Sequence, residues 1–516
     1  MKNAGKDKEN LSNQAEIDKN LKLLLKSSYL IFIGLIFSKI FTYLYRIILA
    51  RNFGPEVYGL FSLAIMVSGW FIVFASIGLP EGLLRFIPWY RGRKQDKEIQ
   101  YIFSLSTRIS LSTGLIAGIL LFLFSGIISI NIFNNPNLII FLKIFAFLIP
   151  LSILANIFIV VLQSFEEIKW YSFILNILQN GVKVLALFVL IFLGFQSNAV
   201  IFSYFIGALI TFVVSYLVCK CKFPQLFKKS FLTRSKKGEM SSGFFSYSWP
   251  LLFSGVINLL FFWVDSFSIG FFRNVTEVGL YNAAVPIVLL LGFAPEIFIK
   301  IFSPLIAREF SKGKFKVVKE LSQQIGKWIF ILNFPFFILM FLFPGVIINI
   351  LFGPTYLPAT NSLRILLVGG FIGSLAWIPN SLLAIKGKSK LILITLAGVS
   401  IMNLFLNIIL VPKYGLEGAA YATTFSKIVL SVILIVEAKH HLSIIPFRRK
   451  IFRIILLTFI PLFLVLFLKT VIEINLISLI LLGAFFSLGY VLLLLLTHCL
   501  DKNDLMILGA IKKKII

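Results

Sequence analysis

Cationic side chains recur at helical spacing inside the first apolar stretch of the chain. Lys39 and Arg46 are two turns apart on one face of a helix, and Thr42 or Tyr43 fills the turn between them. A cation inside an apolar helix is costly in lipid, so it usually faces a partner helix or a water-filled cavity. Snorkelling to the membrane interface is the alternative, and it is easier for Arg46 than for Lys39. The spacing therefore predicts a cavity lined by cations.

A carboxylate lies inside the seventh apolar run. Ser254, Asn258 and Asp265 fall on one helical stripe. An intramembrane carboxylate can carry a proton or a sodium ion. The alternative is a buried ion pair with a cation of the first span, such as Arg46. Both roles could alternate during a transport cycle.

Two further spans carry polar residues at helical spacing. Asn176, Asn180 and Lys183 stand at i, i+4 and i+7, and Thr423 and Lys427 stand at i and i+4. These side chains either line a polar path or form hydrogen bonds between helices.

The composition requires a membrane protein. The 516 residues are 59% hydrophobic and only 14% charged, and the apolar residues come in long unbroken runs. A β-barrel would need short alternating segments instead. The net charge of +28 comes from cations between the apolar runs, so it indicates topology and anionic-lipid contacts rather than nucleic acid.

About fourteen apolar runs are long enough to span a bilayer, which predicts an all-α integral membrane protein. The loops predicted to lie outside carry only Arg51, Arg273, Lys413 and Lys469, whereas Lys and Arg are frequent in the others. This asymmetry places both termini in the cytoplasm and the chain in the cytoplasmic membrane.

The sequence around the first outer turn returns later in the chain. Residues 51–61 align, with small gaps, with residues 273–281, and six spans separate the two copies. An even number of spans implies two parallel six-helix lobes. The expected organisation is a polar tail that is disordered or lies at the membrane surface (1–22), an N-lobe (23–221), a cytoplasmic linker (222–242), a C-lobe (243–440), and two added helices with a cytoplasmic tail (441–516).

Three stretches carry a resemblance to a known family. They are residues 46–64, residues 245–284, and the motif Tyr-Gly-Leu-Glu-Gly-Ala-Ala-Tyr-Ala-Thr-Thr at 414–424. The chain resembles the Wzx-type oligosaccharide flippases of the multidrug/oligosaccharidyl-lipid/polysaccharide exporter superfamily. The resemblance implies a V-shaped pair of lobes around a central cavity, and transport of lipid-linked sugars from the inner to the outer leaflet.

The resemblance also suggests roles for the candidate residues. Lys39 and Arg46 would bind the phosphate or pyrophosphate of a polyprenyl carrier, because the arginine fork suits phosphate. Arg85 would be an entry contact for the head group or an ordinary cytoplasmic cation. Lys183 and Lys427 would line the sugar path, and Asp265 would couple transport to an ion.

Other functions are kept open as alternatives. They are a peptidoglycan-precursor flippase, a drug or sodium exporter with an acidic cavity, and a non-transporting scaffold or membrane enzyme of polysaccharide assembly. The sequence has no Walker loop, no catalytic constellation and no cysteine or histidine cluster at metal-ligand spacing. We therefore expect a monomer that is not an enzyme and has no cofactor, with lipid-linked sugar, membrane lipids and other assembly proteins as partners.

Overall fold

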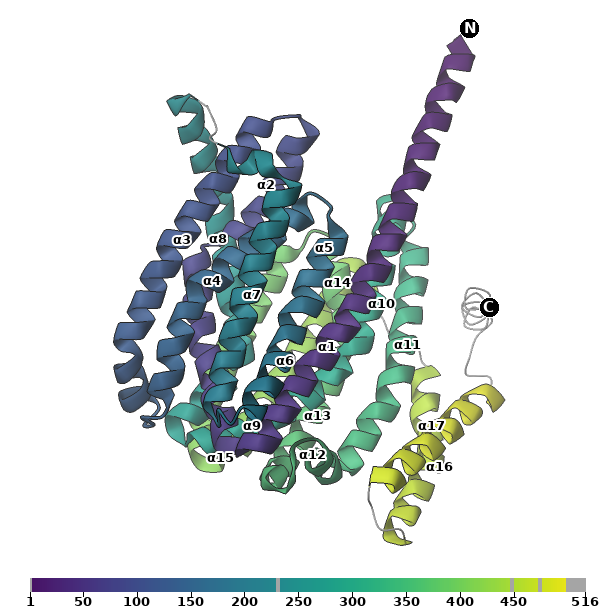
Figure 1. The fold of residues 1–516 in the computed structure, drawn as a ribbon. Coiled ribbons are helices and arrows are strands. Elements are labelled where there is room, and N and C mark those ends of the chain that lie inside the picture. Colours follow the sequence, from purple (N-terminus) through teal and green to yellow (C-terminus); the bar gives the residue numbers. More distant parts are fainter. Residues whose placement is uncertain (1, 229–232, 446–449, 472–475, 498–516) are drawn as a thin grey trace. The chain divides into compact units, whose positions relative to one another are not determined.

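The computed structural model describes residues 2–228, 233–445, 450–471 and 476–497, and every element in these ranges is a helix (Figure 1). The chain divides into two compact units. Unit 1 comprises Met1–Trp263 and Asn274–Thr276, and unit 2 comprises Val264–Arg273 and Glu277–Ile516. The predicted tail lies outside the described residues after residue 497.

Unit 1 is a bundle of long helices. Within it α4 packs against both α3 and α7, and α1 packs against α4 and α6. The elements are α1 (Lys2–Ser76), α2 (Leu79–Gly92), α3 (Asp96–Ile127), α4 (Leu138–Ser164), α5 (Ile168–Ser172), α6 (Gln179–Phe192), α7 (Asn198–Lys222) and the first part of α8 (Arg234–Phe272).

A sharp kink divides α1 into two helices. Gly54 has φ 77° and ψ 179°, and Pro55 follows it. Only glycine adopts this backbone conformation readily, and proline tolerates the first turn of the second helix. The first outer turn, expected within residues 51–61, therefore lies at these two residues.

The polar N-terminal residues are helical in the structure. Helix α1 begins at Lys2 and runs without a break into the first apolar run. The expectation of a cytoplasmic tail that is disordered or lies at the membrane surface stays a prediction. The Lys, Glu, Gln and Leu residues of this stretch are good helix formers, so they extend the helix that follows them.

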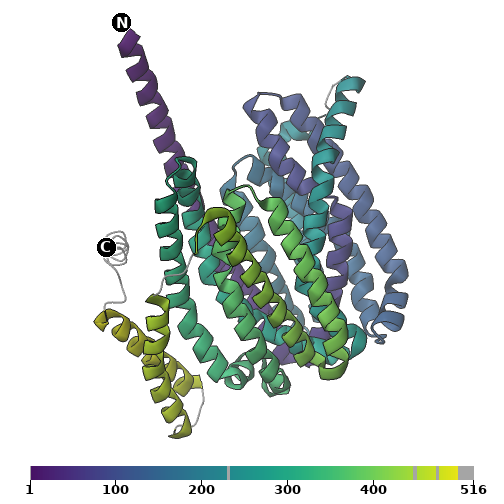
Figure 2. The ribbon, with the colours of Figure 1, turned by 180° about the vertical axis from the view of Figure 1, so that it is seen from behind.

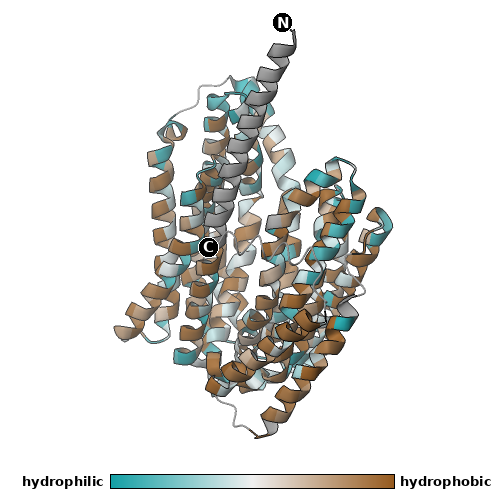
Figure 3. Ribbon diagram, turned by 90° about the vertical axis from the view of Figure 1, so that its right-hand side faces the viewer, coloured by the Kyte–Doolittle hydropathy of each residue, from teal (hydrophilic) through white to brown (hydrophobic). Residues whose placement is uncertain are grey.

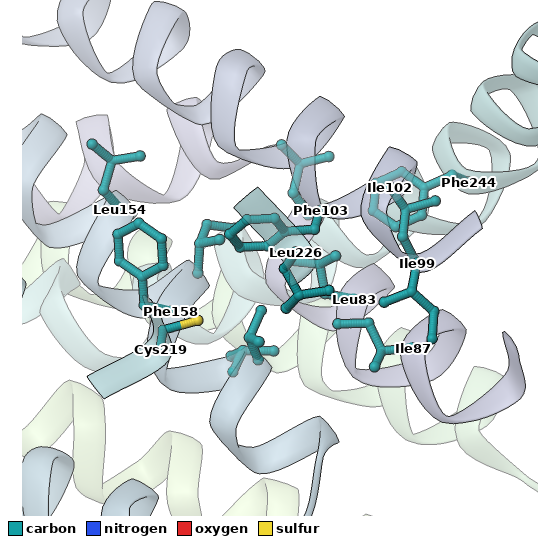
Figure 4. Close-up of a cluster of buried hydrophobic side chains, with 14 of the residues drawn as sticks. Leu83, Ile87, Ile99, Ile102, Phe103, Leu154, Phe158, Cys219, Leu226 and Phe244 are labelled. Carbon is teal, nitrogen blue, oxygen red and sulfur yellow. The ribbon is translucent and has the colours of Figure 1, made fainter. Parts of the chain in front are cut away.

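An apolar cluster joins the start of α8 to the rest of unit 1 (Figure 4). Phe244 of α8 packs there with Leu83 of α2 and with Ile99 and Ile102 of α3. A Cβ atom on Gly78 would lie 2.2 Å from the backbone oxygen of Ser248, so the start of α2 and the backbone of α8 approach closely. These contacts explain why α8 belongs to unit 1 as far as Trp263. The C-lobe is predicted to begin earlier, at residue 243. The lobe boundaries stay a prediction.

Unit 2 contains the end of α8 and the helices that follow. Figure 2 shows the green helices of this unit, where α13 and α14 both pack along α15. Its elements are α9 (Val275–Leu289), α10 (Phe293–Ser311), α11 (Phe315–Leu342), α12 (Pro344–Phe352), α13 (Thr360–Leu375), α14 (Trp377–Ile385), α15 (Ser389–Leu442), α16 (Lys450–Val471) and α17 (Leu476–Leu496).

Apolar residues dominate the helices, as the brown colouring in Figure 3 shows. Ten described helices are long and apolar enough to cross a membrane. Large apolar side chains also stay exposed, such as Phe192 (86%) and Phe463 (75%). A surface of this kind is stable only against lipid, so the chain is a multi-pass membrane protein. The kinks at Gly54 and Gly415 each divide one long helix into two; the total of fourteen spans stays a prediction.

Candidate functional site

Asp265 is the centre of a buried polar cluster in unit 2. Its side chain is 5% exposed and accepts three hydrogen bonds from neutral groups. The donors are the Tyr281 hydroxyl of α9 at 2.5 Å, the Thr423 hydroxyl of α15 at 2.5 Å and the Asn407 amide of α15 at 2.9 Å. A buried carboxylate needs such donors to offset the water that it has lost.

Asn403 forms a second layer behind these donors. Its amide donates to the Thr423 hydroxyl at 3.3 Å, and its side-chain oxygen accepts from Asn407 at 3.1 Å. The side-chain oxygen of Asn407 is buried and has no hydrogen-bond partner among the described residues. Carboxylate, hydroxyl and amide oxygens thus gather in one place, and such oxygens suit a proton or a hard cation.

A kink in α15 brings these residues together. Gly415 has φ 56° and ψ −132°, and it reverses the chain between the helix half with Asn403 and Asn407 and the half with Thr423. A Cβ atom on Gly415 would lie 2.6 Å from Glu277 Oε2. Glu277 in turn pairs with Arg273 at 3.2 Å. Only glycine fits this position, both for its backbone conformation and for the space around it.

Lys427 lies close to the Asp265 cluster. It is half-buried and stands one helical turn after Thr423 on the same half of α15. The structure therefore groups Asp265, Thr423 and Lys427, which the sequence analysis had assigned to two separate roles.

The cations of the first span lie on α1 in unit 1. Lys39 is exposed and Arg46 is half-buried. Arg46 Nη1 donates a hydrogen bond of 3.3 Å to the hydroxyl of Tyr58, which is fully buried beyond the kink. Among the side chains that the structure describes, no carboxylate pairs with Lys39 or Arg46. Both cations thus remain available to an anion.

Lys183 lies inside unit 1 rather than on an open surface. Its side chain is 8% exposed, and its ammonium group lies 3.9 Å from the centre of the Tyr204 ring. The aliphatic part of the Lys183 side chain packs against Gly207. A Cβ atom added to Gly207 would lie 2.4 Å from Lys183 Cγ. This position favours the alternative of contact between helices. The polar neighbours agree, because Asn180 of α6 bonds to Ser38 of α1 at 3.0 Å.

Arg85 is exposed at the C-terminal part of α2. Its guanidinium lies 4.1 Å from the ring centre of Tyr247 in α8, which also belongs to unit 1. The structure thus places the six candidate residues in separate environments: Asp265 and Lys427 together, Arg46 and Lys39 on α1, Arg85 on α2, and Lys183 in the interior of unit 1.

Sequence reasoning did not assign Tyr281 and Asn407 as hydrogen-bond donors to Asp265, and it missed Asn403 behind them. Asn403 and Asn407 carry the same i, i+4 asparagine spacing as Asn176 and Asn180, six spans earlier. That repeated spacing was the available signal. It marks the two helices as equivalent, although it does not reveal which carboxylate they contact.

A family of known proteins matches much of the chain. The family described as "Polysaccharide biosynthesis protein" matches residues 24–308, more than half of the 516 residues. The chain belongs to the polysaccharide biosynthesis protein family. A putative O-antigen transporter of Shigella flexneri is 26% identical over 395 residues, which cover 75% of this chain and 90% of that protein.

Solved structures share the fold of this polysaccharide biosynthesis family member. An inward closed conformation of the lipid II flippase MurJ superposes with a TM-score of 0.71 at 21% identity, covering 90% of this chain and 98% of that one. An inward-facing multidrug resistance MATE transporter of the MOP superfamily reaches 0.65 at 14% identity, covering 79% and 94%. The fold is therefore that of the MOP transporters, as the resemblance implied.

Proposed function

We propose that this protein flips lipid-linked oligosaccharide or polysaccharide repeat units from the inner to the outer leaflet of the cytoplasmic membrane by alternating access. Three findings support the proposal: the family, the O-antigen transporter relative, and a fold in common with a lipid II flippase. The proposal includes two lobes that rock around a central cavity, both termini in the cytoplasm, and the action of a transporter rather than an enzyme.

The observation that carries the proposal is the environment of Arg46. Its guanidinium lies within a helix long enough to span the membrane, is half-buried, and has a neutral hydroxyl as its hydrogen-bond partner. A cation held in such a place without a described carboxylate partner suits a mobile anion. The phosphate or pyrophosphate of a polyprenyl-linked sugar is such an anion, and Lys39 would add to its binding.

The Asp265 cluster would couple transport to an ion. In this part of the proposal, protonation of the carboxylate or binding of a sodium ion alternates with the hydrogen-bonded state. Lys427, which stands one helical turn after Thr423, would sense the change. A membrane potential of 100 mV supplies about 2.3 kcal/mol for each charge that crosses, which is enough to bias such a cycle.

Rival functions make different demands on these residues. A lipid II flippase would use the same cations with another sugar, and a MATE-like exporter would depend on Asp265 but not on Arg46. A scaffold for other assembly proteins would depend on neither. Arg46 therefore separates sugar-phosphate flipping from the exporter and the scaffold.

The decisive experiment measures the leaflet in which lipid-linked sugars accumulate. The host is depleted of the protein, and an impermeant probe reads the outer leaflet. We expect delivery to stop, to return with the wild type, and to fail with Arg46→Ala at equal membrane abundance. Arg91→Ala is the matched control, because Arg91 pairs with Glu166 at 3.8 Å. Normal delivery by Arg46→Ala would rule out the phosphate role.

A further inference from the structure

Helix α2 carries a stripe of two arginines and a tryptophan. Arg85 and Trp89 lie one turn apart on one face of α2, and Arg93 follows at the same interval of four residues as the C-cap of the helix. All three are exposed, and the indole of Trp89 is 52% exposed. At 1.5 Å per residue, the two arginines are spaced by about 12 Å along the helix axis.

Each arginine of the stripe lies over an aromatic ring. The Arg85 guanidinium is 4.1 Å from the ring centre of Tyr247, and that of Arg93 is 4.3 Å from the ring centre of Trp89. When the planar face of a guanidinium stacks on an aromatic ring, the N–H groups at its edge can still bind another partner. Both edges are therefore free to bind an oxyanion.

Arg91 on the same helix differs from the arginines of the stripe. It pairs with Glu166 at 3.8 Å, and its guanidinium lies 5.7 Å from the ring centre of Phe165. Within the part of the chain that the structure describes, Arg85 and Arg93 have no such carboxylate partner. The stripe is thus a pair of oriented cations without counter-ions, rather than a structural ion-pair network.

The opposite face of α2 fixes the direction of the stripe. Leu83 and Ile87 are fully buried in the apolar cluster of unit 1, where Figure 4 shows them beside Ile99. The backbone of α2 is also pressed against α8 at Gly78 and Gly82. The helix therefore cannot rotate without losing this core, and the stripe stays turned outward.

We propose that Arg85, Trp89 and Arg93 form a binding site for the phosphate group of membrane-anchored lipids, at which the lipid-linked sugar is first captured. This step rests on the proposed function, since capture would precede transfer to Arg46. The N–H edges of the two guanidinium groups would bind the phosphate oxygens, and an exposed indole of this kind is stable at a membrane interface. The spacing of the arginines allows a phosphate to pass from Arg93 to Arg85.

Binding of two phosphate lipids tests the site. The purified full chain in nanodiscs of zwitterionic lipid is titrated with polyprenyl phosphate and, separately, with phosphatidylglycerol. We expect Arg93→Ala and Trp89→Ala each to weaken polyprenyl phosphate binding about five-fold, in line with the strength of a partly desolvated cation–π contact. Arg91→Ala is the matched control and should change binding less than two-fold. Trp89→Phe should restore most of the binding lost in Trp89→Ala.

The two probes distinguish the sources of the phosphate. Loss of polyprenyl phosphate binding alone assigns the site to the substrate, and loss of both assigns it to membrane lipid phosphates in general; either result supports the site. Unchanged binding of both, or an equal loss with Arg91→Ala, overturns it. If depletion of the protein leaves delivery to the outer leaflet unchanged while Arg93→Ala still loses binding, the proposed function fails and the site stands.

Discussion

The side-chain amide of Asn407 donates a hydrogen bond of 2.9 Å to Oδ1 of Asp265, although 142 residues separate the two in the chain. Asn407 lies before the kink of α15, and Thr423, which bonds to Oδ2 of the same carboxylate, lies after it. A change in the charge of Asp265 therefore acts on both halves of α15 at once. In the proposed cycle, protonation or ion binding at the carboxylate would move the helix through this connection.

Asp265→Asn should abolish ion-coupled flipping while the protein still folds. Asparagine has the same shape and keeps one acceptor oxygen, but its amide group replaces the second oxygen, and it neither titrates nor carries a negative charge. We expect the flipping rate to lose its dependence on pH or sodium. The rate in proteoliposomes, measured over a pH series and a sodium series, tests this.

Ser266→Ala is the control for the Asp265 variant. Ser266 is the next residue of α8 and is buried, and its hydroxyl accepts a hydrogen bond from Asn282 at 2.9 Å. Its loss should lower stability by about 1 kcal/mol and leave the ion dependence intact. An Asp265→Asn protein that keeps the wild-type ion dependence would contradict the coupling role.

The sequence was sufficient wherever the deciding signal was local. Gly54 and Pro55 are a local signal for the kink in α1, because few residues tolerate that backbone conformation. The apolar runs are a local signal for the helices. It was insufficient where helices distant in the chain meet. Periodicity places Asn407 on a face of its helix, but it cannot reveal that this face meets Asp265. The interior position of Lys183 likewise depends on Gly207 of another helix.

Lys183→Met tests whether this lysine lines the sugar path. Methionine keeps the apolar stem that packs beside Gly207, but it loses the ammonium group over the Tyr204 ring. Because a buried cation also costs desolvation, we expect the free energy of unfolding to change by no more than about 1 kcal/mol. The flipping rate should stay within about two-fold of the wild type. If the Lys183→Met protein is stable but does not flip its substrate, this result would support a role for Lys183 in lining the sugar path.

Gly54→Ala should destabilise the protein although the site has room for a methyl group. No atom lies within 4 Å of a Cβ at this position, so the cost arises from φ 77° alone and amounts to about 1–3 kcal/mol. Gly398→Ala in α15 is the control, because that site is equally open and carries no positive φ. It should be neutral or stabilising by up to about 1 kcal/mol. Thermal unfolding in one detergent compares the two, and equal shifts would argue against backbone strain at the kink.

Tyr58→Phe should weaken substrate binding through Arg46. The Tyr58 hydroxyl accepts the 3.3 Å hydrogen bond from Arg46 Nη1, so its loss leaves the guanidinium free to turn away from the phosphate. We expect affinity for polyprenyl phosphate to fall about three- to ten-fold in the wild-type background, as for one hydrogen bond, and not to change further in Arg46→Ala. Tyr45→Phe is the control, because Tyr45 is also a buried tyrosine of α1 and bonds to Val200 and Ser203 instead. Its effect should be the same with and without Arg46. Additive effects of Tyr58→Phe and Arg46→Ala would mean that Tyr58 supports the fold but does not position the cation.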